Sequence, residues 1–358
     1  MVDLNSSGAP LRKIGLSLVV PVLNESESVG PFLARVGPIV EALMRPHGPA
    51  VGYEIVFVDD GSTDDTVARL VALRADHPTI RIVRLSRNFG KDTALSAGLE
   101  HSSGAAVVPL DVDLQDPPEA IPELYAKWLE GNDIVYATRV DRASDSAAKR
   151  VTAGLFYRIY NKIADTKIPD NAGDFRLLDR KVVDALCQLP ERNRFMKGLY
   201  SWVGFRQASI EIVRAPRAAG TSKWRYWRLW NFALDGITAF STMPLRIWSY
   251  VGALIAAAAF AYALFLIVRT ILMGADVPGY ASLMVAVLFM GGVNLMSLGV
   301  LGEYLGRAYT EVKRRPLYLV LERIGFPQDH ITQQTDNRQW TPQSTTEWRP
   351  TKIGIGGS

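Results

Sequence analysis

The chain has a single cysteine, Cys187, in 358 residues. One thiol cannot build a disulfide framework, so the sequence favours a reducing compartment. No apolar stretch precedes Leu16, and a signal peptide is therefore not expected. The net charge is only +4, which gives no support to nucleic-acid binding. No Gly-x-Gly-x-x-Gly follows the first apolar run, which excludes a dinucleotide-dependent oxidoreductase.

Charges are also missing from two long segments, 247–268 and 277–302. Each is long enough to cross a hydrocarbon core of about 30 Å as a helix, and two such runs close together fit a membrane hairpin better than the alternative of two buried core helices. The positive-inside rule places both soluble ends in the cytoplasm. The flanking cations behind this orientation are Arg225, Arg228 and Arg246 before the first run and Arg307, Lys313, Arg314 and Arg315 after the second.

Short apolar runs alternate with helical patterns over the first part of the chain. Predicted strands cover 16–20, 54–58, 80–83, 106–110 and 134–137, and predicted helices cover 29–44, 63–75, 91–100 and 118–130. This alternation predicts an α/β fold with a Rossmann-like, mostly parallel sheet covered on both faces. Helices are also expected at 147–163 and 181–189, in a region whose pattern is harder to interpret.

Polar clusters follow three of the predicted strands. Asn24 and Glu25 follow the first, the run 59–62 follows the second, and the run 111–113 follows the fourth. In parallel α/β sheets, ligands bind at the carboxyl ends of the strands. Three polar strand ends on one edge therefore predict a binding site.

The run PLDVDLQDPP, 109–118, is a candidate metal site. Crowded carboxylates repel one another unless a cation or a donor network compensates. Alternate side chains of an extended segment point the same way, so Asp111, Asp113 and Gln115 are expected to converge. Mg²⁺ and Mn²⁺ take oxygen ligands, often one or two carboxylates with phosphate and water. The hypothesis is a divalent cation carrying a nucleoside diphosphate, although a lone Asp-x-Asp is a weak motif.

The run VDDGSTDDT, 58–66, supplies a second set of polar side chains. Gly61 permits a tight turn, and Ser62 and Asp64 are assigned to capping a helix that starts near Thr63. Asp60 has no such structural role in this interpretation, so it is expected to accept hydrogen bonds from a base or a ribose. Lys91, in the first turn of a later helix, either contacts the nucleotide or is a solvated lysine.

Tryptophan recurs at every third residue in the segment 222–240, at Trp224, Trp227 and Trp230, with arginines between. The pattern is typical of an amphipathic helix at a membrane interface, with an aromatic core face as the alternative. The tail 328–358 lacks apolar periodicity and is expected to be disordered.

Several motifs, in order, resemble family 2 glycosyltransferases of the GT-A fold. They are VVPVLNE (19–25), FVDDGSTDDT (57–66), LDVDLQDPPE (110–119), GDFRLLDR (173–180), RAAGTSKW (217–224) and LGEYLGRAY (301–309). Together they are similar to the subgroup that glycosylates polyprenyl phosphates, the GtrB-type glucosyltransferases, with dolichol-phosphate mannose synthase more distant. The resemblance extends to about Pro316 and includes the hairpin.

The resemblance implies roles for particular residues. The nucleotide sugar would be bound by Pro21, Leu23, Glu25, Asp60, Asp111, Val112, Asp113, Arg217 and Lys223. The metal ion, Mg²⁺ or Mn²⁺, would be bound by Asp113 and Gln115 with Asp111 beside them, and the acceptor phosphate by Arg139, Lys149 and Arg150. Asp174 falls at the position of the proposed catalytic base, and Asp111 is a second catalytic candidate. Ala153 replaces a serine that is usual in the subgroup, which weakens the assignment of the acceptor-phosphate contact there.

The implied reaction is the inverting transfer of one sugar, glucose by resemblance, from a nucleotide sugar such as UDP-glucose to undecaprenyl or decaprenyl phosphate. The metal ion, Arg217 and Lys223 would stabilise the leaving diphosphate. A phosphate nucleophile is already ionised near neutral pH because its second pKa is about 6. Asp174 is therefore expected to orient the acceptor or the sugar more than to remove a proton. Its alternative is a turn or cap residue, and the basic residues have surface charge as theirs.

The predicted organisation has five parts: a cytoplasmic GT-A domain (1–216), interfacial helices (217–246), a transmembrane hairpin (247–306), a juxtamembrane segment (307–327) and a disordered tail (328–358). We expect a protein of the bacterial inner membrane, with its catalytic domain in the cytoplasm, that makes a lipid-linked sugar for cell-envelope glycans. The resemblance also suggests a homo-oligomer, a tetramer.

Other functions are left open by the sequence. One alternative is a non-catalytic membrane protein that uses the fold as a sugar-nucleotide sensor or scaffold. Another is a related transferase that uses mannose, galactose or amino-arabinose. A processive polysaccharide synthase is disfavoured, because two spans do not readily form a glycan channel and no Gln-x-x-Arg-Trp precedes them.

Overall fold

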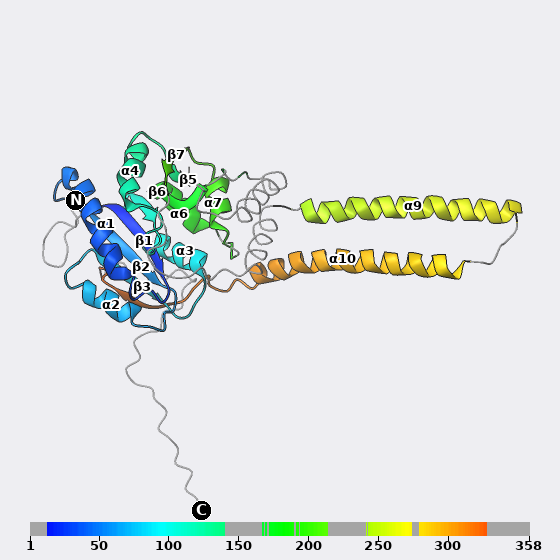
Figure 1. Cartoon of the computed structure of the whole chain (residues 1–358), viewed down its shortest axis with the longest axis horizontal. Helices are drawn as coiled ribbons and strands as arrows, with labels where there is room; N and C mark the ends of the chain where they lie inside the picture. The colour runs from blue at the N-terminus through cyan, green and yellow to red at the C-terminus, as the bar shows by residue number, and fades with distance from the viewer. Residues whose placement is uncertain are drawn as a thin grey trace, which may run out of the picture.

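The computed structural model describes residues 13–139, 167, 169, 172–189, 191–192, 194–213, 241, 243–273 and 279–327. An α/β domain carries a long two-helix hairpin that leaves it on one side (Figure 1). The predicted helix 147–163, the Trp-rich segment 222–240 and the tail 328–358 lie outside the described residues.

The described strands form one mixed sheet in the order β7-β5-β6-β4-β1-β2-β3-β8. Their bounds are β1 Lys13–Val22, β2 Val51–Asp59, β3 Ile80–Leu85, β4 Ala106–Pro109, β5 Ile134–Arg139, β6 Ala172–Asp179, β7 Gln207–Ile212 and β8 Val320–Ile324. Strands β4, β1, β2 and β3 run parallel to their neighbours in this set, as β5 does to β7. Strand β6 is antiparallel to β4 and β5, and β8 is antiparallel to β3. The mostly parallel sheet is confirmed, with two antiparallel strands that the sequence did not indicate.

Helices cover both faces of the sheet, which is why its central strands are rich in Val, Ile and Leu. On one face lie α1 (Val29–Met44), α2 (Thr66–Leu73) and α4 (Ile121–Leu129), which follows a short 3₁₀ turn (Pro118–Ala120); a second such turn (Arg45–His47) follows α1. On the other lie α3 (Lys91–His101), α6 (Arg180–Gln188) and α7 (Met196–Trp202). Alternate residues of β1 serve the two layers: Leu18 packs with the first set and Val19 with the second.

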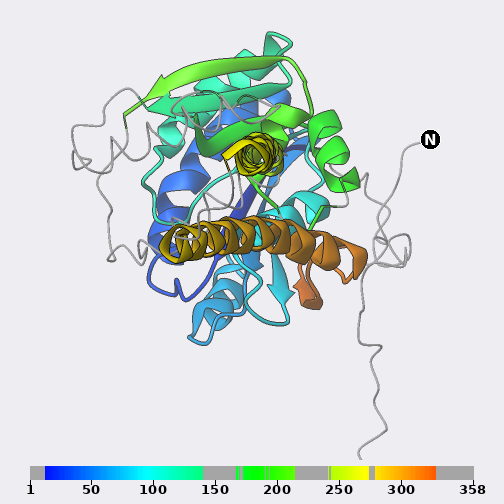
Figure 2. The ribbon, with the colours of Figure 1, turned by 90° about the vertical axis from the view of Figure 1, so that its right-hand side faces the viewer.

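The hairpin consists of α9 (Met243–Met273) and α10 (Tyr280–Val312). Their apolar stretches, Leu245–Met273 and Val285–Val312, are long enough to cross a membrane and are not buried within the chain. Such fully exposed apolar helices are consistent with two transmembrane helices in contact with lipid. The Tyr304 hydroxyl donates to the Ser241 carbonyl at 2.8 Å, which ties α10 to the residues just before α9. Figure 2 views the domain from the hairpin side, with α9 seen end-on.

After α10 the chain returns to the sheet and adds β8 beside β3. The Tyr318 hydroxyl donates to Glu100 Oε2 at 2.5 Å, at the C-terminal end of α3. Arg192 also binds the end of α10 and the chain after it. Its backbone N–H donates to Glu311 Oε1 at 2.8 Å, and its side-chain Nε donates to the Arg315 carbonyl at 2.5 Å. Part of the predicted juxtamembrane segment, 307–327, is therefore a strand of the main sheet.

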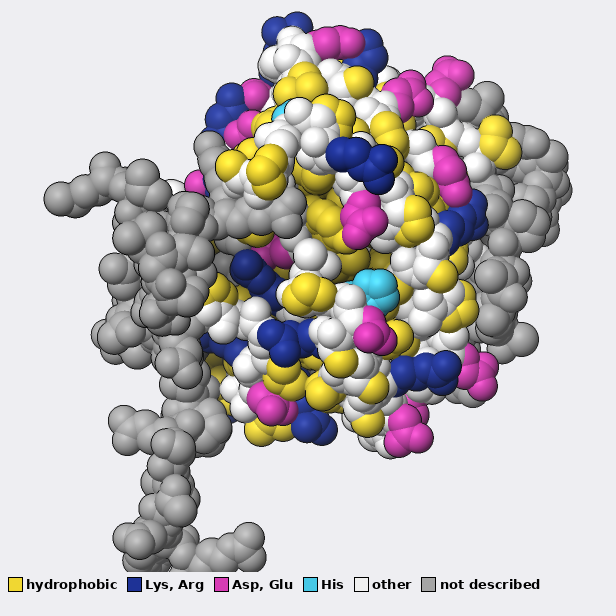
Figure 3. All heavy atoms as spheres, turned by 90° about the vertical axis from the view of Figure 1, so that its left-hand side faces the viewer, with side chains coloured by type: hydrophobic (Ala, Val, Ile, Leu, Met, Phe, Trp, Pro, Cys, Tyr) yellow, Lys and Arg dark blue, Asp and Glu magenta, His cyan; other side chains and the backbone are white. Residues whose placement is uncertain are grey.

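The face of the domain turned away from the hairpin is a mixed surface. Lys, Arg, Asp and Glu side chains are intermingled there, with apolar side chains between them (Figure 3). Such a pattern is typical of a water-facing surface. It agrees with the small net charge of the chain.

Candidate active site

Two loops at the carboxyl ends of β1 and β2 are bound to each other by hydrogen bonds. Asn24 has a left-handed backbone (φ 54°), which Asn adopts more readily than most residues. Its backbone N–H donates to Ser62 Oγ at 2.9 Å, and its Oδ1 accepts from the Thr63 N–H at 2.8 Å. The Glu25 N–H donates to Thr66 Oγ1 at 2.9 Å. These bonds fix the edge on which Glu25 lies.

The predicted helix cap at Ser62 is wrong, because Ser62 accepts from Asn24 and α2 begins later, at Thr66. Asp64 takes a related role: its Oδ1 accepts from the Thr66 N–H at 3.0 Å and from Thr66 Oγ1 at 2.5 Å. The pKa of Asp64 is lowered, mainly because the Thr66 hydroxyl donates a hydrogen bond to its carboxylate.

Asp60 has a structural role, contrary to the sequence-based expectation. Its buried carboxylate accepts from the Phe89 N–H at 2.7 Å and from the Gly90 N–H at 2.9 Å, so it holds the loop that leads into α3. Gly61 is required beside it, because its φ is 78° and a Cβ would lie 2.6 Å from the Arg87 carbonyl carbon. Burial raises the pKa of Asp60 and outweighs the two backbone N–H groups, which act to lower it. Carboxylate oxygens accept more than one bond each, so a nucleoside contact by Asp60 stays a prediction.

The acidic run after β4 is a turn and not an extended segment. A turn spans Val112 and Asp113, and Leu114 has a left-handed backbone (φ 55°). The Gln115 N–H donates to Asp113 Oδ1 at 3.2 Å. The predicted alternation is nevertheless preserved: Val112, Leu114 and Asp116 are buried, and Asp111, Asp113 and Gln115 are partly exposed.

The donor set of this turn suits a cation that also binds phosphate. Within the described residues, no three His, Cys, Asp or Glu side chains gather into a metal cage. Asp111, Asp113 and Gln115 instead offer two carboxylates and an amide oxygen from one turn. Mg²⁺ and Mn²⁺ sites on phosphate substrates commonly have such a sparse protein contribution, so the residues present fit the ion.

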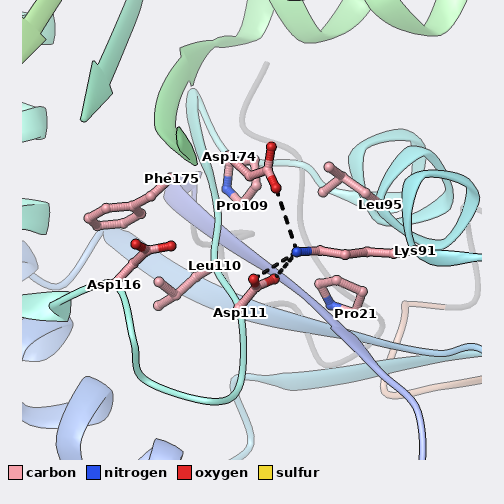
Figure 4. A pocket seen from close by; sticks show the side chains of 9 residues that line it. All are labelled: Pro21, Lys91, Leu95, Pro109, Leu110, Asp111, Asp116, Asp174 and Phe175. Carbon is pink, nitrogen blue, oxygen red and sulfur yellow. Dashed lines mark hydrogen bonds and ion pairs between the residues drawn. The ribbon is translucent and has the colours of Figure 1, made fainter. Parts of the chain in front are cut away.

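A pocket lies between this turn, the end of β1, α3 and β6 (Figure 4). Its lining residues are Pro21, Lys91, Leu95, Pro109, Leu110, Asp111, Asp116, Asp174 and Phe175. Lys91 points into it: the Nζ atom is 2.7 Å from both carboxylate oxygens of Asp111 and 3.7 Å from Asp174 Oδ2. From α7, Lys197 Nζ is 3.8 Å from Asp174 Oδ1. Pro21, Asp111 and Asp174 were predicted as site residues, and the structure brings them together.

Asp174 lies within β6, so the alternative that it is a turn or cap residue is wrong. Lys91 lines the pocket, and its side chain is also 45% exposed to solvent. Burial acts to lower the pKa of Lys91, but the carboxylates of Asp111 and Asp174 outweigh it and raise the pKa above its ordinary value.

Asp92 is a second group that the sequence did not single out. It follows Lys91 in the first turn of α3, and burial together with the charge of Asp174 raises its pKa to about 7. Perturbed pKa values cluster at functional sites. An acid in a helical first turn is common, so the sequence alone carries no signal that distinguishes Asp92.

The other predicted site residues that the structure describes are not part of the pocket lining. Leu23 and Glu25 follow β1, and Glu25 Oε2 accepts from Ser28 Oγ at 2.7 Å. Arg139 is the last residue of β5. Four predicted residues lie outside the described part of the chain: Lys149, Arg150, Arg217 and Lys223.

Comparison with known families and sequences gives consistent results. Residues 17–187 match Glycosyl transferase family 2, and residues 243–308 match the GtrB C-terminal hairpin. A glycosyltransferase of Synechocystis sp. is 54% identical over 87% of this chain and 96% of its own length. The SfII prophage-derived bactoprenol glucosyl transferase of Shigella flexneri is 51% identical over 85% of this chain and 97% of its own length. A prophage bactoprenol glucosyl transferase homolog of Escherichia coli is 49% identical over 85% and 98%.

Solved structures with a similar fold include glucosyl-3-phosphoglycerate synthase from Mycobacterium tuberculosis, in complex with Mn²⁺, UDP-glucose and phosphoglyceric acid. It is 22% identical, with a TM-score of 0.41, and the match covers 63% of this chain and 77% of that one. The family 2 match includes strands β2 to β6, and the hairpin match includes α9 and most of α10. The chain belongs to glycosyl transferase family 2, is a glycosyltransferase, and carries the GtrB-type C-terminal hairpin of the bactoprenol glucosyl transferases.

Proposed function

We propose that this glycosyltransferase moves one glucosyl residue from UDP-glucose to a polyprenyl phosphate, with inversion at the anomeric carbon. The observation that carries the proposal is the pocket in which Lys91, Asp111 and Asp174 meet, in a domain joined to an apolar hairpin. The names of the bactoprenol glucosyl transferases, about half identical over most of the chain, support the acceptor and the sugar.

The donor would lie at the carboxyl ends of β1, β2 and β4. Pro21, Leu23, Glu25 and Asp60 are proposed to hold the nucleoside, with Val112 toward the diphosphate. Asp113 and Gln115, with Asp111, are proposed to hold Mg²⁺ or Mn²⁺, and a bound cation would supply positive charge to the leaving diphosphate. Arg217 and Lys223 are proposed to add charge on the same side.

The acceptor would enter from the β6 side of the pocket. Its phosphate oxygen is ionised near neutral pH, so the chain needs to orient it more than to deprotonate it. Asp174, held between Lys91 and Lys197, is proposed as that orienting carboxylate. Arg139, Lys149 and Arg150 are proposed to bind the acceptor phosphate.

The hairpin supports a location of this pocket near a membrane. A polyprenyl phosphate stays in the bilayer, so the pocket has to be close to the headgroups. Helix α3 has 11 residues and is about 16 Å long. Lys91 lies in the first turn of α3, at the pocket. Glu100, near the other end of α3, accepts a hydrogen bond from Tyr318, a few residues after α10. The pocket is therefore about the length of α3 away from the segment that follows the hairpin. In Figure 1 the hairpin leaves on the side of α3, α6 and α7. We propose an inner-membrane protein with its catalytic domain in the cytoplasm, organised in the segments given above and assembled as a homo-oligomer.

The test is turnover by the full-length, detergent-purified chain. A panel of UDP- and GDP-sugars is incubated with a short polyprenyl phosphate, with and without a chelator, and products are identified by mass. We expect a glucosyl lipid from UDP-glucose only when a divalent ion is present. Asp113→Asn should lower turnover by about 100-fold or more, while the control Asp184→Asn, an exposed acid on α6, should not.

Each other outcome has a meaning for the proposal. A glycolipid that carries a different sugar would show that glucose is the wrong donor sugar. Turnover in the presence of a chelator would show that the reaction does not require a divalent metal ion. If the chain binds a nucleotide sugar but no glycolipid forms with any acceptor tested, the sensor or scaffold function replaces this one.

A further inference from the structure

Two carboxylates face one pocket at the end of the β4–β6 pair. Val107 pairs with Leu178 in this antiparallel ladder. Asp111, just after β4, and Asp174, in β6, both line the pocket beyond it. Like charges in one site repel each other unless a cation compensates.

A single ammonium group contacts both of them. Lys91 Nζ is 2.7 Å from each oxygen of Asp111, a close, charge-assisted geometry. It is 3.7 Å from Asp174 Oδ2, so it attracts that carboxylate without a direct hydrogen bond. Figure 4 shows the lysine reaching across from α3 to both acids. Lys197 approaches the other oxygen of Asp174 from α7, at 3.8 Å.

The position of Lys91 is itself fixed by the sheet. Gly90, the residue before it, has a φ of 100° and donates its N–H to Asp60 at the end of β2. Phe89 donates to the other oxygen of Asp60. The start of α3 is therefore bound to the buried end of a central strand, and the lysine projects from an anchored point.

We propose that Lys91 is a positioning residue that holds Asp111 and Asp174 at a set separation across the pocket. This inference rests on the proposed function, in which Asp111 lies on the donor side and Asp174 on the acceptor side. Asp111 follows β4 closely, and Asp174 lies in β6, the neighbouring antiparallel strand. Lys91 thus aligns the donor-binding part with the acceptor-binding part, and the attacking phosphate oxygen meets the anomeric carbon in line.

The first test separates alignment from binding. Lys91→Met keeps the aliphatic stem and removes the charge. A displacement of about 1 Å at a reacting centre costs on the order of 100-fold in rate. We expect kcat to fall by about 100-fold, while the KM for UDP-glucose changes by less than about threefold. Lys91→Arg, which restores a cation, should recover kcat to within about tenfold of the wild type.

The second test is a double-mutant cycle with Asp174→Asn, read by rate and by thermal unfolding. Lys91→Met leaves two carboxylates in one pocket without their shared cation, so we expect Tm to fall by a few degrees. Asp174→Asn added to Lys91→Met should restore part of that loss. In the Asp174→Asn background, Lys91→Met should cost less than about fivefold in rate. Lys197→Met is the matched control, and its Tm loss should be smaller because Lys197 has no 2.7 Å contact with Asp111.

Three results would overturn the inference. Lys91→Met could leave kcat within threefold of the wild type; its effect could be fully additive with Asp174→Asn; or it could raise the donor KM by the same factor by which it lowers kcat/KM, which would make Lys91 a donor-binding group. All three require a wild-type chain that makes the glycolipid. Absence of wild-type product contradicts the proposed function instead, and the Tm cycle still reports whether Lys91 links the two acids.

Discussion

Gly98, in the middle of α3, is the position where the packing of the catalytic helix can be tested most directly. A Cβ there would lie 2.2 Å from Val19 Cγ1 and 3.0 Å from Val58 Cγ2, and both valines are fully buried. Overpacking of this kind costs about 1–3 kcal/mol. Alanine recovers about 0.5–1 kcal/mol over glycine in a helix. Gly98→Ala should therefore lower the free energy of unfolding by about 1 kcal/mol, and by at most about 2.5 kcal/mol.

The assay is thermal unfolding of the full chain in detergent, beside glycolipid formation. For a domain of this size, 1 kcal/mol corresponds to about 2–4 °C, so Tm should fall by about 2–4 °C and by at most about 10 °C. Because α3 carries Lys91, the outward shift of the helix should also lower turnover by at least tenfold. Gly30→Ala is the control, since Gly30 is helical in α1 and a Cβ there meets nothing within 4 Å. Equal Tm values for the two variants, at or above the wild type, would refute the argument.

Two further predictions concern buried charges. Glu54, 1% exposed, accepts from Ser17 Oγ at 2.5 Å and from the Ser103 N–H at 2.6 Å, and it pairs with Arg81. Glu54→Ala leaves Arg81 without this partner and should lower the free energy of unfolding by about 3–5 kcal/mol in guanidinium titration; a loss below about 1 kcal/mol would contradict this. Burial, with the charge of Arg323, lowers the pKa of His101 to about 4, from 6.5. Between pH 4 and pH 6.5 the folded chain then binds fewer protons than the unfolded chain. The contribution of His101 to stability is therefore full above pH 6.5 and falls toward pH 4, with a loss of about 2 kcal/mol at pH 5. His101→Gln should flatten this dependence of the unfolding free energy on pH, and an unchanged dependence would assign it to other groups.

The elements that the sequence predicted well are those whose signal is local. Helix α1 has the predicted bounds, Val29–Met44, because its apolar residues recur on one face. Strands β1 to β5 were found from Val- and Ile-rich runs that both layers of helices bury. Strand β6, AGDFRLLD, was missed because Gly173, Asp174 and Arg176 interrupt its apolar pattern. A tertiary contact accounts for Arg176, whose guanidinium packs on the ring of the buried Tyr200.

The candidate site was predicted in part for the same reason. Asp111 and Asp174 were identified by motif, and they lie in one pocket. The structural role of Asp60 was missed because its partners, Phe89 and Gly90, come from a different loop, and pairing between loops leaves no periodic pattern in the sequence. Lys91 was left undecided because a lysine in a first helical turn is usually solvated. Its contacts with Asp111 and Asp174, which come from two other segments of the chain, show what it faces.

Strand β8 has a consequence for biogenesis. It covers the edge of β3, yet residues 320–324 leave the ribosome only after both apolar helices have been made. Until then the growing chain carries an open strand edge, the kind of surface that recruits unwanted partners. In the membrane location proposed above, the catalytic domain would therefore be completed only after the hairpin has been made, beside the lipid surface on which it is proposed to work.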